Sequence, residues 1–454
     1  MSSTKSQFSS KIGFVLTAAG SAVGLGNLWR FPYLSATYGG GIFLFIYLIL
    51  AVTFGFALMV TEIAIGRKTG YSAVRAYKSL HRRFGFLGYL SALVPVLIFP
   101  YYCVIGGWVT KYFATYIAGQ GTQAAQDGYF SGFITKVGEP ILWLAVFLVV
   151  VSLVVMMGVQ KGIEKVSKFL MPALVVLTIG LSIYVMTLPG AMDGVVYYLK
   201  PDFSKFSIKT VIAALGQLFY SMSLAMGIMI TYGSYMKKEN NLESSVRQIE
   251  IFDGGIAFFS GLMIVPAVYA FSNGDPEVMS SKGAGLMFDT LPKVFHHLGP
   301  GISTAIGIIF FLLVFFAALT SAISLMETVV SFCQDKFGWH RIVTCLIVLA
   351  GSFLIALPSS LGYGPLDMIR PLGLNILDFV DFISNNLLMP VVALLMCIFV
   401  GWVLRPKAII DEVKISSRFR EEKLYSVIIR FVAPVFLMVI LVSSVLDVLG
   451  IFTI

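Results

Sequence analysis

Residues 20–32 read Gly20-Ser21-Ala22-Val23-Gly24-Leu25-Gly26-Asn27-Leu28-Trp29-Arg30-Phe31-Pro32, and they interrupt an apolar segment that begins at Ile12. The whole segment has the length and apolar character of a membrane span. Inside a bilayer, an opened backbone survives only where it is buried in protein or lines a polar cavity, because each unpaired amide or carbonyl group costs roughly several kcal/mol. The three glycines therefore predict a broken membrane helix whose freed backbone groups bind ions or a small polar ligand.

Two other interpretations of this stretch stay open. Gly20 and Gly24 form a small-xxx-small pair, which more often indicates close helix packing than a binding site. The Gly24-x-Gly26 pattern is also found in nucleotide-binding loops, but here it lacks the preceding strand, the third glycine and the acidic residue that follows. Asn27 and Arg30 lie within two turns of the glycines, and a charged residue so deep in an apolar segment favours a functional site.

The composition is that of a polytopic membrane protein. The chain of 454 residues is 58% hydrophobic and 12% charged, with a mean hydropathy of +0.90, whereas soluble domains are roughly 45–50% apolar and 25% charged. Its net charge of +9 arises from Lys and Arg in short loops, which set orientation in the membrane and predict no nucleic-acid partner. The four scattered cysteines have no metal-binding spacing and are expected to be apolar fillers. The N-terminus has no cleavage site, so the first span is expected in the mature protein.

Apolar segments predict about eleven membrane spans. They lie at about 13–37, 42–65, 88–118, 140–158, 168–188, 211–235, 250–272, 302–333, 341–357, 376–403 and 427–448. Most Lys and Arg residues lie at the N-terminus or in the loops that follow the even-numbered spans. Because cytoplasmic loops carry the excess of positive charge, the N-terminus is expected in the cytoplasm and the C-terminus outside.

A second interruption follows about 200 residues after the first, at Gln217-Leu218-Phe219-Tyr220-Ser221-Met222-Ser223-Leu224-Ala225-Met226-Gly227. Two broken helices at corresponding places indicate an inverted repeat with a binding site at its interface. The predicted fold is therefore an all-α integral membrane protein of about eleven helices, with a five-plus-five inverted repeat in which helices 1 and 6 are broken. Residues 1–454 form a single domain, with repeats at about 11–190 and 205–403 and an additional C-terminal helix at about 427–448.

In these stretches the chain resembles the neurotransmitter:sodium symporter family. Three further motifs carry the resemblance along the chain: Tyr38-Gly39-Gly40-Gly41, Tyr101-Tyr102, and Phe316-Ala317-Ala318-Leu319-Thr320-Ser321. The family usually has twelve spans, and this chain is expected to have eleven. The resemblance implies sodium-coupled uptake of an amino acid by alternating access, with movement of a bundle of spans against a scaffold.

The resemblance also implies two sodium sites. The first would use the Ala22 carbonyl, Asn27, Ser221 and Asp253, completed by the carboxylate of the substrate. The second would use the Gly20 and Val23 carbonyls with Ala317, Thr320 and Ser321. For the last two hydroxyls, hydrogen bonding to the preceding helical turn is the alternative.

Asp253 departs from the family pattern, in which some members have an amide there and a carboxylate one turn later, where this chain has Ala257. Animal relatives instead bind chloride near a tyrosine and a glutamine that resemble Tyr47 and Gln217. Two cations and a zwitterion need a balancing anion in a low dielectric. We therefore expect Asp253 to replace chloride, and transport to be independent of it; its protonation on ion release could also carry a proton outward.

The substrate class follows from the resemblance and from the charges that are absent. Gly24 stands where amine carriers of the family have an aspartate, which favours a substrate with its own carboxylate. The implied substrate is a hydrophobic L-amino acid, branched or aromatic. The implied substrate-binding residues are Ala22, Leu25, Gly26, Ile98, Tyr102, Tyr220, Ser221, Ser223, Met226, Ser321 and Leu325. Taken one at a time, the apolar members of this set would be equally consistent with core packing.

Two gates complete the resemblance. Arg30 and Asp381 resemble an extracellular ion pair, with Tyr102 and Tyr220 as an aromatic lid. The expected cytoplasmic gate consists of Lys5, Phe8, Tyr235 and Asp335. Because lysine lacks the bidentate fork of arginine, the cytoplasmic gate is expected to open more easily. Gly162 and Pro172 match a family pattern of local unwinding in span 5.

The sequence thus favours a non-enzymatic symporter in the bacterial inner or plasma membrane, a monomer or weak dimer that uses two sodium ions. A non-transporting sensor and a carrier of small polar amino acids are the alternatives on the same fold. A gated channel is less favoured because the polar residues cluster at mid-depth. A membrane enzyme is disfavoured because His81, His296, His297 and His340 lie in loops and no nucleophile lies beside a base.

Overall fold

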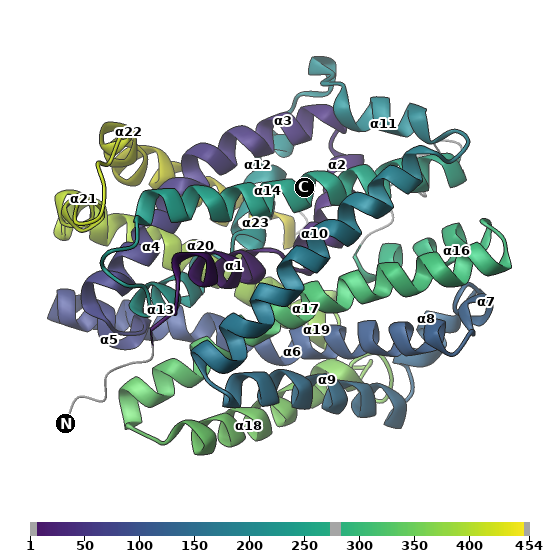
Figure 1. Cartoon of the computed structure of the whole chain (residues 1–454), viewed down its shortest axis with the longest axis horizontal. Coiled ribbons are helices and arrows are strands. Elements are labelled where there is room, and N and C mark those ends of the chain that lie inside the picture. Colours follow the sequence, from purple (N-terminus) through teal and green to yellow (C-terminus); the bar gives the residue numbers. More distant parts are fainter. Residues whose placement is uncertain (1–6, 273–282, 449–454) are drawn as a thin grey trace.

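The computed structural model describes residues 7–272 and 283–448, which fold into a bundle of helices with their long axes broadly aligned (Figure 1). Nine helices in this part of the chain are long and apolar enough to cross a membrane, and one bent helix pair forms a tenth candidate. A further broken pair, α12 (Ile208–Ser221) and α13 (Ile228–Ser234), occupies the place of the predicted sixth span. The prediction of an all-α fold with about eleven membrane helices is confirmed.

The long helices follow the predicted spans, with π-helical turns at several of their ends. They are α3 (Gly41–Leu50) with η2 (Ala51–Gly55) and α4 (Phe56–Thr69), α6 (Gly85–Ile117), α9 (Gly138–Met156), η4 (Val159–Glu164) with α10 (Lys165–Met186), α14 (Leu242–Ser272), α17 (Pro300–Phe337), α18 (Arg341–Leu361), α19 (Ile376–Asp381) with η8 (Phe382–Leu388), α20 (Met389–Ile398) and η9 (Phe399–Val403), and α22 (Glu422–Val427) with η10 (Ile428–Val432) and α23 (Ala433–Val448). Short connecting helices include α5 (Ala73–Leu80), α7 (Gly121–Ala124), α8 (Tyr129–Ile134), α11 (Ala191–Leu199), η6 (Leu286–Thr290), α16 (Leu291–His296) and α21 (Lys407–Lys414).

The first span is broken where the glycines predict. Helix α1 (Lys11–Ala22) begins after Ser10, whose hydroxyl accepts a hydrogen bond from the Gly13 amide, an ordinary N-cap. It ends at Val23, whose backbone is extended, and the chain resumes as the π-helical turn η1 (Gly26–Arg30) and helix α2 (Phe31–Thr37). The two halves are bent by 53°.

The second break lies between α12 and α13. Ser223 and Ala225 have φ values of 52° and 61°, which residues other than glycine rarely adopt. Gly227, at φ 70°, begins the second half. A backbone held in such conformations needs support from its surroundings, and the neighbouring spans supply it.

The broken spans lie inside the bundle. Helix α1 packs against α10, α14 and α17, and α13 packs against α4 and α17, while α6 packs against α9, α17 and α18. In Figure 1, α1 and α13 lie between the group that contains α3, α14 and α10 and the group that contains α6, α9 and α18. The two breaks are therefore enclosed by protein, as an opened backbone at membrane depth requires.

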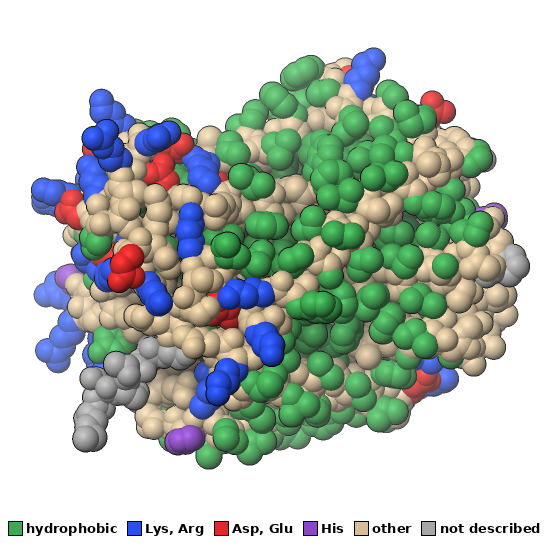
Figure 2. All heavy atoms as spheres, viewed as in Figure 1, with side chains coloured by type: hydrophobic (Ala, Val, Ile, Leu, Met, Phe, Trp, Pro, Cys, Tyr) green, Lys and Arg blue, Asp and Glu red, His purple; other side chains and the backbone are tan. Residues whose placement is uncertain are grey.

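Charge is concentrated at one end of the long axis. Figure 2 shows that most of the Lys and Arg side chains visible on this face lie toward the end that contains α5, α21 and α22, while hydrophobic side chains cover the middle of the face.

The start of span 5 is helical in this structure. Gly162 lies in η4, a hydrogen-bonded π-helical turn that leads into α10, so the local unwinding that the resemblance implies for Gly162 and Pro172 is not present.

Candidate functional site

A cavity of about 30 Å³ lies between the two helix breaks. It is lined by backbone and side chains from four spans: Ser21, Ala22, Gly24, Leu25, Gly26, Ile98, Tyr102, Tyr220, Ser223, Met226, Ile228, Ser321 and Leu325. Ten of the eleven residues expected to bind substrate are among them. Ser221 is not among them, and its hydroxyl donates to Asp253 at 2.9 Å. Of the other three lining residues, Gly24 was expected to determine the type of substrate. Ser21 and Ile228 were not expected at the substrate site, although both lie next to glycines that mark the breaks.

Hydroxyl groups connect the two breaks across this cavity. The Ser223 hydroxyl donates to the Ser21 carbonyl at 2.9 Å, and the Ser21 hydroxyl donates to Ser223 Oγ at 3.3 Å. Behind the second break, Glu62 of α4 accepts a hydrogen bond from the Ala225 amide at 2.5 Å, and its Oε2 has no partner among the described residues. A carboxylate in the middle of an apolar span is itself a signal of function, and Glu62 could have been found in this way.

A polar cluster surrounds the fully buried Asp253 of α14. Its Oδ1 accepts hydrogen bonds from Asn27 Nδ2 at 2.8 Å and from Ser221 Oγ at 2.9 Å, and its Oδ2 accepts one from the Tyr47 hydroxyl at 3.3 Å. The structure thus places three of the residues expected at the first sodium site in direct contact. The fourth, Ala22, lines the adjoining cavity.

Gln217 and Asn27 also hold the backbone of the first break. Gln217 Nε2 donates to the Gly26 carbonyl at 2.9 Å, and the Asn27 Oδ1 accepts from the Gly24 amide at 3.1 Å. These bonds satisfy backbone groups that the interruption of the helix leaves without helical partners. The two side chains therefore stabilise the opened conformation.

The residues expected at the second sodium site lie where α17 crosses the first break. Ser321 Oγ lies 3.5 Å from the Gly20 carbonyl oxygen and 3.3 Å from that of Val23, and 3.2 Å from that of Ser21. Thr320 instead donates to the Phe316 and Ala317 carbonyls at 3.1 Å each. For Thr320 the structure therefore shows the hydrogen bonding to the preceding turn that was the alternative.

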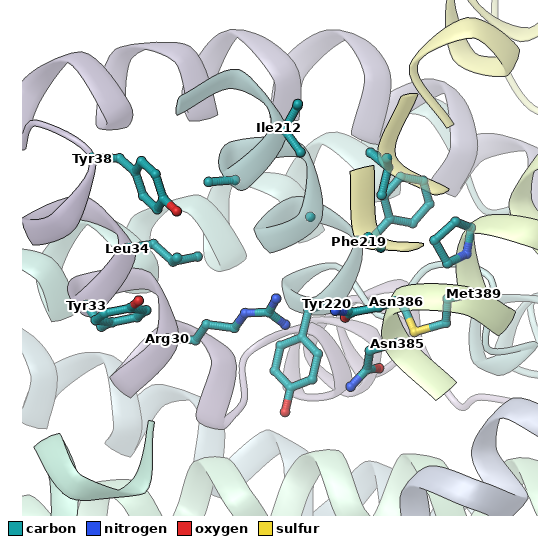
Figure 3. A pocket seen from close by; sticks show the side chains of 15 residues that line it. Arg30, Tyr33, Leu34, Tyr38, Ile212, Phe219, Tyr220, Asn385, Asn386 and Met389 are labelled. Atoms are coloured by element: carbon teal, nitrogen blue, oxygen red, sulfur yellow. The ribbon is translucent and has the colours of Figure 1, made fainter. Parts of the chain in front are cut away.

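Two cavities lie on the side of Tyr220 away from α13. Arg30 and Tyr220 line both a cavity of about 220 Å³, drawn in Figure 3, and a second cavity of about 280 Å³ whose wall includes Asp381. Among the described residues, Arg30 and Asp381 form no ion pair. The Arg30 guanidinium carbon lies 5.1 Å from the centroid of the Tyr220 ring, and Asp381 accepts hydrogen bonds from Tyr101 and Asn385. Arg30 and Asp381 thus line the same cavity, as expected of an outer gate, but they do not contact each other in this structure.

On the side away from Arg30 and Asp381, the cavity between the two breaks is closed by packed side chains. Phe8 is buried against the rings of Phe14, Tyr232 and Tyr235, and its amide donates to the Tyr235 carbonyl at 3.1 Å. The Asp335 carboxylate accepts a hydrogen bond from the Ser72 amide at 2.7 Å. Lys5, the remaining residue expected at this gate, lies outside the described residues.

An ion pair at this inner side was not expected from the sequence. Glu327 of α17 is fully buried and pairs with Arg341 of α18 at 2.5 Å, and it also accepts a hydrogen bond from the Tyr235 hydroxyl at 2.8 Å. Arg341 also donates to the Val155 carbonyl. The charges sit at separate places in the sequence, so only the fold shows that they meet.

The donor atoms at the breaks are backbone carbonyls, hydroxyls, one amide and one carboxylate. In the described part of the chain, no three His, Cys, Asp or Glu side chains gather at a site that could hold a metal ion. Hard oxygen donors suit a hard cation such as an alkali ion, whereas nitrogen and sulfur ligands suit transition metals. The cavity beside these donors is mostly apolar, with backbone amides and hydroxyls at one end.

Comparisons with known proteins agree with this arrangement. A family model described as "Sodium:neurotransmitter symporter family" matches residues 5–122 and 128–451. The "Uncharacterized sodium-dependent transporter YhdH" of Bacillus subtilis is 34% identical over 452 residues, covering 96% of this chain and 97% of that protein. The rat "Sodium- and chloride-dependent taurine transporter" is 26% identical, covering 88% of this chain and 71% of that protein.

A solved structure matches the fold of nearly the whole chain. The crystal structure of MhsT in complex with L-phenylalanine has a TM-score of 0.88 and 35% sequence identity, and the match covers 97% of this chain and 100% of that one. A sodium-dependent transporter from Methanocaldococcus jannaschii is 34% identical, covering 88% of this chain and 82% of that protein.

Proposed function

Because the chain belongs to the sodium:neurotransmitter symporter family and is therefore a sodium-dependent symporter, we propose that it carries hydrophobic L-amino acids, branched or aromatic, into the cell. The observation that carries this proposal is the cavity between the two breaks. Its lining residues, all in the described part of the chain, include no charged side chain. An amino acid would therefore meet its charges in the opened backbone and in bound sodium, and its side chain in apolar surroundings.

The carboxylate of the substrate would bind at the first break. The Leu25 amide donates to the Tyr102 hydroxyl at 3.4 Å, so the two groups lie together at one end of the cavity, where both could turn to donate to a carboxylate. A Cβ atom at Gly24 would lie 2.6 Å from Ser321 Oγ and 3.1 Å from the Tyr102 hydroxyl. An acidic side chain at position 24, which would pair with an amine substrate, therefore has no room, and this supports a substrate with its own carboxylate.

The apolar end of the cavity supports a hydrophobic side chain. Ile98, Met226, Ile228 and Leu325 line it, and MhsT, whose structure this chain matches, was crystallised with L-phenylalanine. The cavity of about 30 Å³ must widen to admit such a side chain. Met226 is unbranched and adapts its shape readily, so we expect it to move and to let side chains of several shapes enter.

Two sodium ions would travel with the substrate. The first would be held by the Ala22 carbonyl, Asn27, Ser221 and Asp253, with the substrate carboxylate completing the set. Asp253 would supply the negative charge that balances the ions in a low dielectric. Transport would then need no chloride, in contrast to what the name of the rat taurine transporter states for that protein.

The second sodium ion would bind where α17 meets the first break. Its ligands would be the Gly20, Val23 and Ala317 carbonyls and the Thr320 and Ser321 hydroxyls. The approach of Ser321 Oγ to two of these carbonyls supports the site. The ligands come from both α1, in the moving bundle, and α17, in the scaffold. This ion would therefore hold the bundle against the scaffold.

Alternating access would open and close two gates in turn, an outer gate at Arg30 and Asp381 and an inner gate at Phe8 and Tyr235. Closure of Arg30 onto Asp381, with Tyr102 and Tyr220 beneath, would seal the outer side. Separation of Phe8 and Tyr235 would open the inner side, where a lysine at position 5 makes a weaker gate than arginine would. The basic end of the molecule (Figure 2) supports a cytoplasmic N-terminus, by the excess of positive charge in cytoplasmic loops.

A carrier of small polar amino acids is the second candidate. The small volume of the cavity and the hydroxyls of Ser21, Ser223 and Ser321 on its wall favour it. The two candidates differ in their preferred substrates: leucine and phenylalanine for the first, alanine and serine for the second.

Binding of radiolabelled amino acids to the purified protein, in sodium and in potassium buffer, tests the proposal. We expect leucine, isoleucine, tyrosine or tryptophan to bind in sodium alone, and Asn27→Ala to abolish this binding. Preferential binding of alanine or serine would favour the second candidate. Binding of no amino acid in either buffer would contradict both.

A further inference from the structure

Asn385, Tyr101 and Asp381 form a closed triangle of hydrogen bonds beside Arg30, which does not pair with Asp381 in this structure. Asn385 Nδ2 donates to Asp381 Oδ1 at 2.6 Å and to the Tyr101 hydroxyl at 3.0 Å, and that hydroxyl donates to the same Asp381 Oδ1 at 2.9 Å. Tyr101 and Asn385 are both buried. Asp381 ends α19, and Asn385 follows in the π-helical turn η8, so the amide is held close to the carboxylate by the backbone.

The carboxylate of Asp381 is stabilised in this structure without a cation in contact. Its Oδ2 accepts no hydrogen bond from any residue that the structure describes, and Arg30 lies over the Tyr220 ring. In Figure 3, the Arg30 side chain points toward Tyr220, and Asn385 lies beyond that ring. A carboxylate removed from water needs either donors or an opposite charge, and here Tyr101 and Asn385 are the donors.

The hydrogen bonds of Asn385 stabilise Asp381 to different extents when Arg30 is apart from Asp381 and when the two are paired. While Arg30 is away, the triangle supplies the only charge-assisted hydrogen bonds that described residues make to Asp381. When Arg30 closes onto Asp381, the guanidinium supplies the opposite charge, so the same hydrogen bonds matter less. A group that stabilises one state more than another shifts the population toward it.

We propose that Asn385 is a positioning residue of the outer gate, which together with Tyr101 stabilises the Asp381 carboxylate while Arg30 is away and so favours the state with an open outer cavity. The proposal rests on the proposed function only in treating Arg30 and Asp381 as that gate. It assigns to Asn385 a role that the cavity between the helix breaks does not require.

The test measures how readily the outer cavity is reached from outside. Ile105 is buried and lines the 280 Å³ cavity. Labelling of Ile105→Cys by a membrane-impermeant thiol reagent, in intact cells in sodium buffer, therefore reports access to this cavity from outside. Asn385→Leu removes both donors at similar volume. We expect it to slow labelling about three- to tenfold. This is less than the roughly ten- to hundredfold effect of a whole charge-assisted hydrogen bond, because the closed state keeps part of the benefit of that bond.

Two further variants separate this role from a structural one. Asn386→Leu changes the next residue, which lines the 220 Å³ cavity without a hydrogen bond to Asp381, and it should label at the parent rate. In an Arg30→Gln background, closure gains no charge pair, so Asn385→Leu should have little effect on labelling. If Asn385→Leu does not fold, Tyr101→Phe removes one donor and should slow labelling in the same direction.

Unchanged or faster labelling of Asn385→Leu would overturn the proposal, and so would equal slowing with and without Arg30. Uptake is measured on the same cells. Sodium-dependent uptake by the parent with no labelling effect would contradict the inference on Asn385 alone. A labelling effect without amino-acid uptake by the parent would leave the role of Asn385 standing and contradict the proposed function.

Discussion

Asp253 is a buried carboxylate that three neutral side chains contact. Asn27, Ser221 and Tyr47 all donate hydrogen bonds to it, yet none of them supplies a positive charge. Burying a negative charge without a cation is unfavourable even when its hydrogen bonds are satisfied. In the proposed function, sodium supplies this charge, and the carboxylate replaces an anion that would otherwise have to bind from solution.

Replacement of Asp253 by asparagine tests this role. Asp253→Asn keeps an oxygen ligand and removes the charge, so we expect the sodium concentration for half-maximal substrate binding to rise about tenfold or more. Added chloride should partly restore binding in the variant and leave the parent unchanged. Asp193→Asn, on the exposed face of α11, is the matched control. Chloride-stimulated uptake by the parent protein would contradict the account.

Substitution of Gly24 tests whether the substrate binds in the cavity between the two helix breaks. Because a Cβ there would lie 2.6 Å from Ser321 Oγ, even Gly24→Ala must displace a side chain. Overpacking of this kind costs about 1–3 kcal/mol, so we expect amino-acid binding to weaken by about ten- to a hundredfold. Gly180→Ala, on α10, where a Cβ would meet no atom within 4 Å, should bind as the parent does. Unchanged affinity of Gly24→Ala would place the substrate elsewhere.

At the scale of the elements, α21 is held to the end of α4 by a buried ion pair. Arg67 Nε lies 2.9 Å from Glu412 Oε1, and Arg67 also donates to the Asn240 carbonyl and to Ser416. Lys238 pairs with the same Glu412 oxygen at 2.6 Å. These contacts tie α21 to α4 and to the segment between α13 and α14.

Breaking this pair from one side should destabilise the protein strongly. Glu412→Leu leaves the Arg67 guanidinium buried without its partner, which costs about 3–5 kcal/mol. We expect a clear fall in the apparent melting temperature of the purified protein, partly recovered in Arg67→Met/Glu412→Leu. Glu422→Leu, which removes a half-exposed partner of Lys414, should change stability by about 1 kcal/mol or less. Equal effects of the two single changes would contradict this interpretation.

The membrane spans and the first helix break were predictable, because long apolar segments indicate the spans and glycines indicate the break. The glycines of residues 20–32 predicted the first break, and the apolar lengths predicted the spans. The left-handed backbone of Ser223 and Ala225 was not predictable, because contacts such as that of Glu62 with the Ala225 amide support it. The pairing of Glu327 with Arg341 and the contacts of Tyr101 with Asp381 and Asn385 join residues from separate helices, and periodicity within one helix carries no information on them. The contact between Asp381 and Asn385 lies within one helical segment, at a spacing of four residues, so helical periodicity could have indicated that part alone.

At the scale of the whole molecule, charge and hydropathy divide along the long axis. On the face drawn in Figure 2, the end near α5, α21 and α22 is basic and the middle is apolar. This division supports the cytoplasmic placement of that end. The repeats at about 11–190 and 205–403 and the monomeric or weakly dimeric state remain predictions.

Labelling of single cysteines tests the orientation. Lys414→Cys, at the basic end, should be protected from a membrane-impermeant reagent in intact cells and should react after permeabilisation. Gln123→Cys, at an exposed position of α7, should react in intact cells. Reversed reactivity of the two positions would place the basic end outside.

The most direct test of the central claim is uptake of radiolabelled L-leucine or L-phenylalanine into proteoliposomes with sodium outside and potassium inside. The account predicts accumulation above the external concentration that needs the sodium gradient, persists without chloride and is lost in Asn27→Ala. Equal uptake in sodium and potassium, or none for any hydrophobic amino acid while small polar amino acids accumulate, would contradict it.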